Sequence, residues 1–335
     1  MEKEKLLDIK DLSVTYKTED GIVYAVNNLN LTLEPKETLG FVGETGAGKT
    51  TTAMTIMGLL PTPPGKVTSG EIMFDGKDML KIGDKERRGI LGEKISMIFQ
   101  DPMTSLNPSM KVGDQIVEMI RLHKVIGKKE AFEEACGLLE MVGIRRERAN
   151  DYPHQFSGGM KQRVVIAIAL ACRPKMIIAD EPTTALDVTI QAQIFELMEK
   201  LKREHDTAIM LITHDMGVVS ELADDVAVMY MGSIVERGSV REVLKYPAHP
   251  YTAALLRSIP ILHKGRGQRL EPIRGSTPDP YDRPKGCQFA PRCDFCCEKC
   301  RQEMPPEVPV CDGHAVRCWN AEQVYAGHRE EVEAV

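Results

Sequence analysis

Short apolar runs and stretches with helical spacing alternate along most of the chain. Runs of strand length are found at Thr38–Val42, Glu71–Phe74, Lys94–Phe99, Met176–Ala179, Ala208–Thr213 and Val226–Tyr230. Apolar positions repeat at helical spacing in Thr50–Leu60, Ser157–Cys172, Thr189–Glu204 and Met216–Ala223. This alternation predicts an α/β fold, in which helices cover both faces of a mostly parallel sheet.

The start of the chain has a two-residue period instead. The period covers two sets of apolar residues: Leu7, Ile9, Leu12, Val14 and Tyr16, then Leu29, Leu31 and Leu33. The first set slips by one position between Ile9 and Leu12. We predict strands in both places.

Two segments depart from the alternating pattern. From about Asp101 to Pro153 helical spacing dominates, which predicts an inserted helical subdomain over residues 101–156. After about Ser258 prolines and cysteines accumulate, and few apolar residues remain to build a core. We therefore expect a main domain over residues 1–258 and a small cysteine-rich module over residues 259–335, stabilised by something other than apolar burial.

Composition excludes several classes of protein. With 335 residues, 42% of them hydrophobic, the chain can build about two domains. A formal net charge of −6 and an aromatic fraction of 5% argue against nucleic-acid binding. The longest apolar run, Val164–Cys172, is far shorter than the ~20 residues of a membrane-spanning helix. The charged N-terminus does not resemble a secretory signal, so we expect a cytoplasmic protein.

A glycine-rich loop between a predicted strand and a predicted helix is the first chemical signal. Gly43-Glu-Thr-Gly-Ala-Gly-Lys49-Thr50 fits the pattern G-x-x-x-x-G-K-[ST] of a P-loop. Backbone N–H groups of such a loop bind phosphate oxygens, while Lys49 can reach the β- and γ-phosphates and Thr50 can ligate Mg²⁺. The predicted nucleotide-binding residues are Gly43, Glu44, Thr45, Gly46, Ala47, Gly48, Lys49, Thr50 and Thr51.

Two acidic residues follow the apolar strand Met176–Ala179. Carboxylates at the C-terminal end of a parallel strand lie at the ligand-binding edge of the sheet. Asp180 suits Mg²⁺ binding, directly or through a water, and Glu181 suits orienting or deprotonating an attacking water. Two acidic residues at a strand end can also simply be exposed to solvent without a function. The presence of a P-loop in the same chain favours the catalytic interpretation.

A second anion-binding feature begins the predicted helix Ser157–Cys172. Ser157, Gly158 and Gly159 provide backbone N–H groups at its N-terminus. One triphosphate hardly needs two such features from one chain, which predicts a composite site between two chains. Gln100 and His214 each follow a predicted strand directly and are further candidates for the site.

The order of these motifs resembles that of the ATPase subunits of ABC transporters, over about residues 5–240. The matching positions are Gly43–Thr50, Gln100, Ser157-Gly-Gly, Asp180-Glu181, Ala185-Leu186-Asp187 and His214. Three stretches resemble the oligopeptide/dipeptide importer branch: Phe99–Pro108, Tyr152–Arg163 and Gly286–Cys293. Phe156 and Met160 depart from the common Leu-Ser-Gly-Gly-Gln signature but leave Ser157 and Gly159 intact.

The resemblance implies a P-loop NTPase core of the ABC ATPase type with a mixed sheet, and it implies roles for single residues. Tyr16 would stack on the adenine of ATP, with Tyr24 as a weaker candidate. Gln100 would bind Mg²⁺ and sense the attacking water, and His214 would contact the γ-phosphate. Asp187 would lie across the interface of a dimer that encloses ATP.

Seven of the nine cysteines lie within the C-terminal module. Disulfides are uncommon in the cytoplasm, so such a cluster indicates a metal site. The positions that match the family pattern are Cys287, Cys293, Cys300 and Cys318, and the additional ones are Cys296, Cys297 and Cys311. The wide spacing of the four favours a [4Fe–4S] cluster, whereas the C-x2-C spacings favour a structural Zn²⁺. Unligated or disulfide-bonded thiols are the third alternative.

The leading hypothesis is an ATP hydrolase that energises import of dipeptides or oligopeptides through a membrane permease. The resemblance implies permease subunits, a sister ATP-binding subunit (or a second copy of the chain in isolation) and, indirectly, an extracytoplasmic substrate-binding protein. Asp101–Pro153 would dock the permease at the cytoplasmic face of the membrane.

The alternatives are nickel or glutathione import by the same machinery, a soluble ABC ATPase with an iron–sulfur module, and a non-hydrolysing nucleotide-binding scaffold. A single P-loop without a coiled coil argues against the soluble ATPase. Intact Glu181 and His214 argue against the scaffold.

Overall fold

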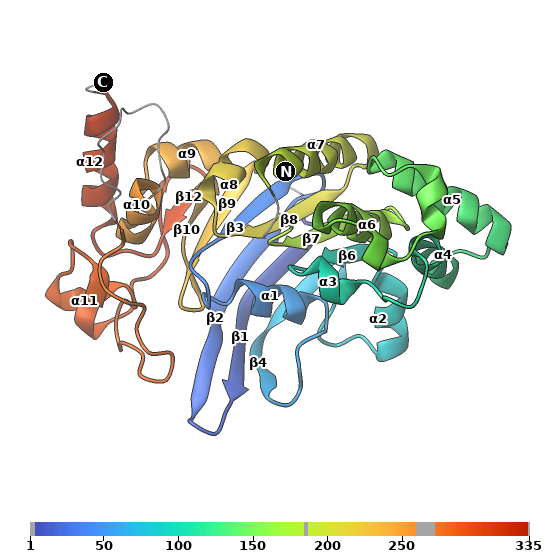
Figure 1. The fold of residues 1–335 in the computed structure, drawn as a ribbon. Helices are drawn as coiled ribbons and strands as arrows, with labels where there is room; N and C mark the ends of the chain where they lie inside the picture. The colour runs from blue at the N-terminus through green and yellow to red at the C-terminus, as the bar shows by residue number, and fades with distance from the viewer. Residues whose placement is uncertain (1–3, 184–186, 259–271, 334–335) are drawn as a thin grey trace. The chain divides into compact units, whose positions relative to one another are not determined.

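The computed structural model describes residues 4–183, 187–258 and 272–333 (Figure 1). The chain divides into two compact units. Unit 1 consists mainly of Asp75–Ile212. Unit 2 consists of Leu7–Thr32, Thr38–Phe74 and the described residues from Thr213 onward.

A parallel sheet forms the centre of unit 1. Its strands are β6 (Ile95–Ile98), β7 (Met176–Asp180) and β8 (Ala208–Thr213), with β7 in the middle. Met176 pairs with Ile95 on one side and with Ala208 on the other, so the strands run in register. All their residues are buried, as the continuous apolar runs predicted, because helices cover a parallel sheet on both faces.

Helices account for most of the rest of unit 1. They are α2 (Asp84–Ile90), α3 (Pro102–Ser105), α4 (Val112–His123), α5 (Lys128–Met141), α6 (Gly158–Leu170) and α7 (Val188–His205), with 3-10 turns η1 (Arg146–Asn150) and η2 (Pro153–Gln155) and a short strand β5 (Lys77–Asp78). Helices α4, α5 and α6 pack against one another through buried residues such as Ile116 and Leu139. The structure therefore has helices where helical spacing predicted them.

Unit 2 contains strands from two sheets. Strands β1 (Leu7–Lys17), β2 (Ile22–Leu33) and β4 (Gly65–Phe74) belong to one sheet. The second has the order β11 (Val308–Cys311), β12 (His314–Val316), β10 (Ser233–Ser239), β9 (Asp225–Tyr230) and β3 (Thr38–Val42). Strand β3 is parallel to β9, and the other neighbours are antiparallel. The helices are α1 (Lys49–Ile56), α8 (Met216–Leu222), α9 (Val240–Lys245), α10 (Pro250–Arg257), α11 (Glu298–Gln302) and α12 (Ala321–Glu333), with a 3-10 turn η3 (Ala290–Arg292).

The slip in the first apolar period is a β-bulge. Strands β1 and β4 pair antiparallel, with register shifts between Lys10 and Ser13. Asp11 adopts a left-handed conformation with φ 48°. The extra residue returns Leu12 to the buried face that Ile9 occupies. The sequence therefore predicted the strand and also the place where its pairing is interrupted.

The cysteine-rich tail shares an apolar core with the rest of unit 2. Phe289 packs in one buried cluster with Tyr230 and Tyr251, and Cys287 and Cys293 contact the same cluster. This differs from the expectation of a separate module without apolar burial. The tail has few apolar residues, but Phe289 among them is buried against Tyr230 of β9 and Tyr251 of α10. The domain boundary at residue 258 stays a prediction, and residues 259–271 lie outside the described part of the chain.

A buried carboxylate also ties the tail to the sheet. Glu236 of β10 accepts hydrogen bonds from the N–H groups of Ala248 at 2.6 Å and His249 at 3.0 Å. Its Oε1 lies 2.7 Å from Nε2 of His314, at the start of β12. Both carboxylate oxygens of Glu236 thus have partners inside the protein, and the contact with His314 stabilises the β10–β12 pairing.

Some elements differ from their predicted bounds. Helix α1 ends at Ile56 instead of Leu60, because the chain turns through Gly58 with φ 66°. Strand β10 was not predicted, because Glu236, Arg237 and Gly238 interrupt its apolar run. Among the described residues, the helices are all too short or too polar to span a bilayer.

Candidate nucleotide-binding site

The glycine-rich loop of unit 2 connects β3 to α1. Gly43 and Gly48 adopt φ values of 155° and 107°. A Cβ atom on Gly43 would lie 2.2 Å from the Met229 carbonyl oxygen, and one on Gly48 would lie 2.2 Å from that of Ala25. Only glycine fits these two positions, because the backbones of β9 and β2 approach the loop so closely. The strand–loop–helix arrangement meets the structural requirement of a P-loop.

Lys49 begins helix α1 and turns back to the loop. Its Nζ donates hydrogen bonds to the carbonyl oxygens of Gly43 at 2.7 Å and Glu44 at 3.1 Å. Lys49 is buried, whereas Thr45, Gly46 and Thr50 are exposed. The structure thus holds a positive charge at the loop, beside exposed backbone that can receive phosphate oxygens.

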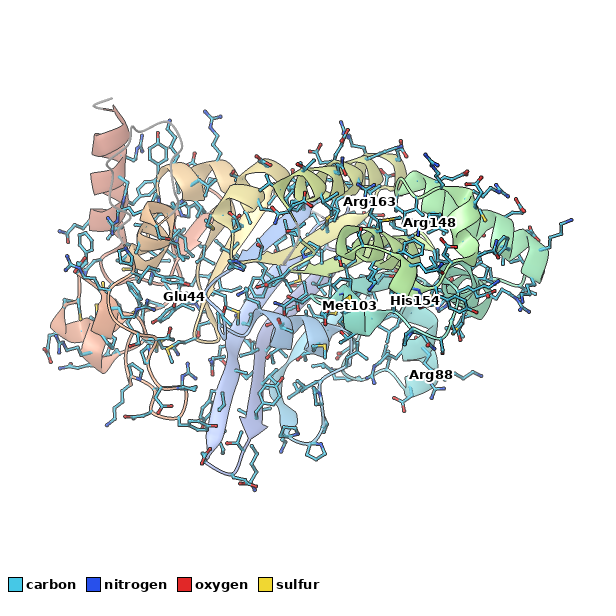
Figure 2. The ribbon with its side chains drawn as sticks, in the orientation of Figure 1. Glu44, Arg88, Met103, Arg148, His154 and Arg163 are labelled. Atoms are coloured by element: carbon cyan, nitrogen blue, oxygen red, sulfur yellow. The ribbon has the colours of Figure 1, made fainter. Side chains whose placement is uncertain are left out.

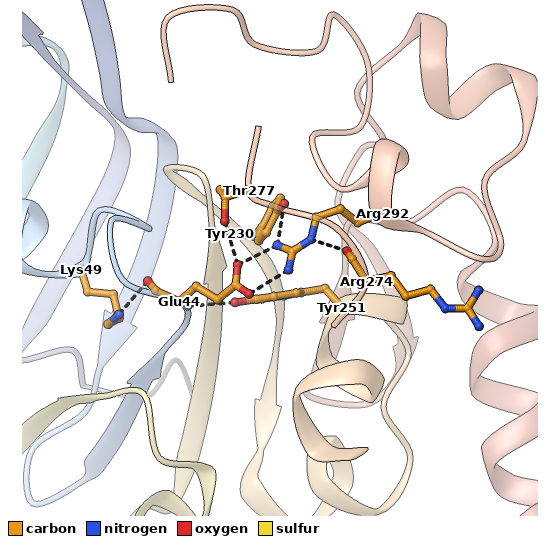
Figure 3. A network of polar contacts seen from close by, with 7 residues as sticks. All are labelled: Glu44, Lys49, Tyr230, Tyr251, Arg274, Thr277 and Arg292. Carbon is orange, nitrogen blue, oxygen red and sulfur yellow. Dashed lines mark hydrogen bonds and ion pairs between the residues drawn. The ribbon is translucent and has the colours of Figure 1, made fainter. Parts of the chain in front are cut away.

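The loop residue Glu44 is the centre of a polar network with the cysteine-rich tail (Figure 3). Its carboxylate accepts two hydrogen bonds from Arg292, Nη1 to Oε2 at 2.8 Å and Nη2 to Oε1 at 3.0 Å. The Thr277 hydroxyl bonds to the same carboxylate at 3.2 Å. The Glu44 N–H donates to the Tyr251 hydroxyl at 2.9 Å. Burial raises the pKa of Tyr251 well above its usual range, so this hydroxyl stays neutral.

Sequence reasoning included Glu44 in the loop but missed Arg292. The only signal in the sequence is its position directly before Cys293, inside the stretch that carries the importer resemblance. Nothing in the pattern of residues links it to a loop that precedes it by 248 positions. The tertiary structure alone brings the two together.

Of the two candidate adenine platforms, Tyr16 lies beside the P-loop helix. Its hydroxyl is 3.4 Å from the Thr51 Oγ1 in the first turn of α1. The ring of Tyr24 instead has the Arg283 guanidinium over it, 5.6 Å from the centroid. Arg283 is fixed there by a 2.8 Å hydrogen bond to the Asn27 side chain.

The predicted catalytic residues of unit 1 meet at the C-terminal edge of its parallel sheet. Asp180 ends β7 and is buried, and Glu181 follows it. Gln100 lies two residues after β6, and its Nε2 donates a 2.8 Å hydrogen bond to Glu181 Oε2. Glu181 has a left-handed backbone with φ 47°, and its N–H donates to the Ile212 carbonyl. A left-handed glutamate is a strained position, which is typical of functional sites.

The N-termini of α6 and α7 also lie close together in unit 1. Ser157 caps α6, and Asp187 caps α7 by accepting a 3.0 Å hydrogen bond from the Ile190 N–H. A Cβ atom on Gly159 would lie 2.9 Å from the Ile190 side chain. The structure therefore brings together Ser157, Gly159 and Asp187, although 30 positions of sequence separate the two helix starts.

The side chain of Arg148 stabilises the turn that precedes α6. The Arg148 guanidinium, labelled in Figure 2, lies 4.4 Å from the centroid of the Phe156 ring. It also donates to the Gln155 carbonyl at 2.9 Å and to the Asp151 carboxylate at 2.8 Å. The phenylalanine that departs from the common signature thus packs under an arginine, directly before Ser157.

His214 follows β8 and is exposed, in unit 2. The predicted motif Ala185-Leu186-Asp187 is described only at Asp187, since residues 184–186 lie outside the described part of the chain. The predicted site residues thus fall into two sets. Of the predicted nucleotide-site residues, unit 2 contains Tyr16, the P-loop and His214, and unit 1 contains the remaining ones.

The four predicted cysteine ligands lie in one neighbourhood of unit 2. The Cys318 thiol interacts electrostatically with Cys287 and Cys300, and the Cys293 thiol with Cys318 and Cys287. Burial raises the pKa values of Cys293 and Cys318 to about 12 and that of Cys300 to about 11. Desolvation therefore favours protonated thiols here, and the thiols would have to lose their protons to bind a metal ion.

The additional cysteines divide into two groups. Cys297 Sγ lies 3.4 Å from Cys300 Sγ, and Cys296 directly precedes Cys297. Cys311, on β11, instead interacts with the Tyr325 hydroxyl. The spacing of the family pattern did not reveal that Cys297 approaches one of the four candidate ligands.

Comparison with known proteins establishes the family. Residues 26–184 match the ABC transporter family, and residues 235–300 match the family described as oligopeptide/dipeptide transporter, C-terminal region. The chain is 51% identical to the oligopeptide transport ATP-binding protein OppD of Bacillus subtilis over 317 residues, which is 94% of this chain and 88% of that protein. The chain belongs to the ATP-binding subunits of oligopeptide/dipeptide ABC transporters. The dipeptide transport ATP-binding protein DppD of the same organism is 50% identical to this ABC ATPase over 322 residues, 96% of each chain.

A solved structure supports the same assignment. This ABC ATPase is similar to the ATP-binding cassette MJ0796 in a dimeric post-hydrolysis state with ADP and Pi, with a TM-score of 0.64 and 30% identity. The similarity covers 70% of this chain and 99% of that one. The predicted ABC ATPase fold, the transporter family and the prediction of an ATP hydrolase are confirmed.

Proposed function

We propose that this ABC ATPase binds ATP and Mg²⁺ between two ATP-binding subunits and uses hydrolysis to drive peptide import through a membrane permease. The hydrogen bond between Gln100 and Glu181 is the observation that carries the catalytic part. It holds a carboxylate at the edge of a parallel sheet, beside the buried Asp180. The relatives named as oligopeptide and dipeptide transport proteins support the peptide cargo over nickel or glutathione.

The chain's own residues divide the chemistry between binding and proton transfer. The P-loop N–H groups and Lys49 bind the phosphates, and Thr50, Gln100 and Asp180 would hold Mg²⁺. Bound Mg²⁺ would supply charge neutralisation at the β- and γ-phosphate oxygens. Glu181 orients the attacking water and accepts its proton, and His214 contacts the γ-phosphate.

Tyr16 is the proposed platform for adenine. Its half-buried ring is anchored through its hydroxyl to Thr51, at the start of the helix that follows the P-loop. Tyr24 is the weaker choice, because Arg283 already covers a face of its ring. We expect Tyr16→Ala to weaken ATP binding more than Tyr24→Ala.

A second subunit would complete each nucleotide site. Ser157, Gly158 and Gly159 begin α6 beside Asp187, and these N–H groups would bind the ATP that a sister subunit holds in its P-loop. The dimeric state of MJ0796 supports this arrangement. We propose a homodimer in isolation and a heterodimer with the sister subunit in the transporter.

The helical part of unit 1 is the proposed contact with the permease, on the cytoplasmic side of the membrane. It contains a shallow groove of about 620 Å³, whose apolar lining residues are Met110, Val117, Leu122 and Tyr152. Lys111, Arg121 and Asp114 add charges at its border. Such a surface suits a short amphipathic helix of a membrane subunit. An extracytoplasmic substrate-binding protein would act only through the permease.

We further propose that Cys287, Cys293, Cys300 and Cys318 hold one [4Fe–4S] cluster, with a structural Zn²⁺ as the alternative. The support is that these thiols interact with one another, Cys318 with Cys287 and Cys300 and Cys293 with Cys318 and Cys287. In the described residues, the side chains that bring three ligand atoms within 4.8 Å of one another are instead Glu242, Cys311 and His314. The cluster would stabilise the fold of residues about 285–320 by linking distant parts of this segment. ATP-driven transport requires no electron transfer, so no redox role follows.

Transport by reconstituted complexes tests the function. The chain is combined with its permease and sister subunit in proteoliposomes, and uptake of labelled di- and oligopeptides is measured with ATP. We expect uptake with the wild-type chain and none with Glu181→Gln, while Ni²⁺ and glutathione are not taken up. Uptake of Ni²⁺ or glutathione in place of peptides would contradict the peptide assignment and leave the ATPase assignment intact.

A further inference from the structure

The P-loop of this protein contains an acidic side chain, whose negative charge has the same sign as that of the nucleotide phosphates. Glu44 is the second residue of the loop, and a triphosphate brings several negative charges to the same backbone. The Arg292 guanidinium lies beside its carboxylate oxygens, at 2.8 and 3.0 Å. An unpaired Glu44 would repel the nucleotide, so its ion pair bears directly on binding.

Arg292 is held in place from several sides. Its Nε donates to the Arg274 carbonyl at 3.0 Å, and its Nη1 lies 3.2 Å from the Tyr230 hydroxyl. Its guanidinium also lies 5.8 Å from the ring centroids of Tyr230 and Phe289. The Arg292 side chain is 5% exposed, compared with 27% for Glu44. A bidentate pair between a buried guanidinium and a half-buried carboxylate is stronger and more directional than a surface ion pair.

The same pair also fixes the path of the loop. The Glu44 N–H is bound to the Tyr251 hydroxyl, and the Glu44 carbonyl accepts from Lys49 (Figure 3). With the carboxylate drawn to Arg292, the side chain and both backbone groups of Glu44 have partners. The three partners Arg292, Tyr251 and Lys49 thereby define one conformation of the residue that follows Gly43.

Arg292 lies between two candidate metal ligands, Cys287 and Cys293. We propose that Arg292 is a positioning residue of the nucleotide site: it neutralises and orients Glu44, and so makes ATP affinity depend on the order of the cysteine-rich tail. This inference rests on the proposed function of the P-loop and adds a regulatory link to it. It follows that loss of the metal should weaken ATP binding.

Equilibrium binding of Mg·ATP to the purified full-length chain tests the proposal. We expect Arg292→Ala to raise the Kd by about 10- to 100-fold, since the bidentate ion pair is lost and a carboxylate is left unpaired. Arg292→Lys should weaken binding less than Arg292→Ala, because lysine keeps the positive charge but cannot form the two parallel hydrogen bonds of the guanidinium. In steady-state hydrolysis, KM should rise more than kcat falls.

A matched control and a double variant separate positioning from general damage. Arg274→Ala removes an exposed arginine of the same segment and keeps the carbonyl that Arg292 uses, so affinity should stay unchanged. Combining Arg292→Ala with Glu44→Gln removes the unpaired charge and should recover affinity relative to Arg292→Ala alone. Metal content per chain is measured for every variant, and it should be normal in Arg292→Ala.

The outcomes decide between this proposal and the function on which it rests. Unchanged Kd in Arg292→Ala, or no recovery in the double variant, would overturn the positioning role while ATP binding by the wild-type chain still supports the P-loop. Absence of ATP binding by the wild-type chain would overturn both. Cys293→Ser should raise the Kd in the wild-type background but not further in Arg292→Ala, and additive effects would overturn the link to the tail.

Discussion

The side-chain amide of Gln100 donates a hydrogen bond of 2.8 Å to the Glu181 carboxylate. The two residues follow neighbouring parallel strands, so the sheet itself brings them to the same edge. Glu181 also adopts a left-handed backbone, a conformation that costs about 1–3 kcal/mol for a residue with a side chain. The carboxylate is therefore oriented by the protein alone.

We expect Glu181→Gln to lower kcat for ATP hydrolysis by about 10²–10⁴-fold, because an amide cannot accept the proton of the attacking water. ATP binding should remain near that of the wild-type chain. Phosphate release and nucleotide binding are measured together, with Glu196→Gln on the exposed face of α7 as control. His214→Ala should lower kcat in the same way. Near-normal turnover in Glu181→Gln would show that another residue orients and deprotonates the attacking water.

Lys49→Ala should raise the Kd for ATP by about 100-fold or more, because the variant lacks the cation that pairs with the β- and γ-phosphates. The carbonyl oxygens of Gly43 and Glu44 also lose their donor. Lys245→Ala, a change at an exposed lysine of unit 2, should leave the Kd unchanged. Fluorescent-nucleotide titration measures both, and equal Kd values for the two variants would refute the role of Lys49.

The composite site predicts complementation between two inactive chains. Lys49→Ala disables the P-loop, and Ser157→Arg places a bulky cation at the start of α6. Mixing equal amounts should restore about a quarter of wild-type activity, because half of the dimers are mixed and each has one intact site. Wild-type specific activity should also rise with protein concentration. Activity that is independent of dilution, together with no complementation, would exclude a shared site.

We expect metal analysis of anaerobically purified protein to find about four irons per chain and a broad absorbance near ~400 nm. Cys293→Ser should lose the metal and disorder the tail, because the folding of such a segment is linked to ligand binding. Cys297→Ser and Cys311→Ser should keep it. One zinc without iron would assign a structural zinc site, and full metal content in Cys293→Ser would refute the ligand set.

Stability should fall as the solution becomes acidic, through His249. Burial lowers the pKa of His249 to about 3 in the folded protein, whereas an unfolded histidine titrates near ~6.5. Below that value the unfolded chain binds a proton that the folded chain does not. The free energy of unfolding should drop by about 1.4 kcal/mol between pH 7.5 and 5.5 from this group.

The variant His249→Asn isolates this contribution. His249 caps α10 by accepting a 3.0 Å hydrogen bond from the Tyr251 N–H, and asparagine can also cap a helix. Denaturant unfolding at both pH values should show a smaller pH dependence for His249→Asn than for the wild-type chain. An identical pH dependence in both proteins would show that other groups are responsible.

The sequence predicted those parts of the fold that local patterns determine. Apolar runs identified β3, β7 and β8, and even the slip at Leu12 proved to be a bulge. Strand β10 was missed, because Glu236 is buried by partners that lie far along the chain. A period of two cannot identify a buried carboxylate that is paired with a distant histidine.

In the candidate site, too, the sequence predicted the residues that belong to local motifs and missed those that depend on tertiary contacts. Short motifs identified the P-loop and the Asp180-Glu181 pair, since their chemistry requires fixed residue types at fixed spacing. Arg292 was missed, because its function depends on a contact with Glu44 that only the tertiary structure creates. The approach of Cys297 to Cys300 was also outside the reach of the pattern.

The contact between Glu236 and His314 joins residues that are 78 positions apart in the chain. On the ribosome, β10 is complete long before β12 emerges to cover its open edge. An unpaired edge strand can pair with strands of other chains. During the same interval Glu236 lacks its contact with His314, which has not yet been synthesised. The pairing of β10 with β12 can therefore form only after Val316 has been synthesised, which makes it a late step in the folding of unit 2.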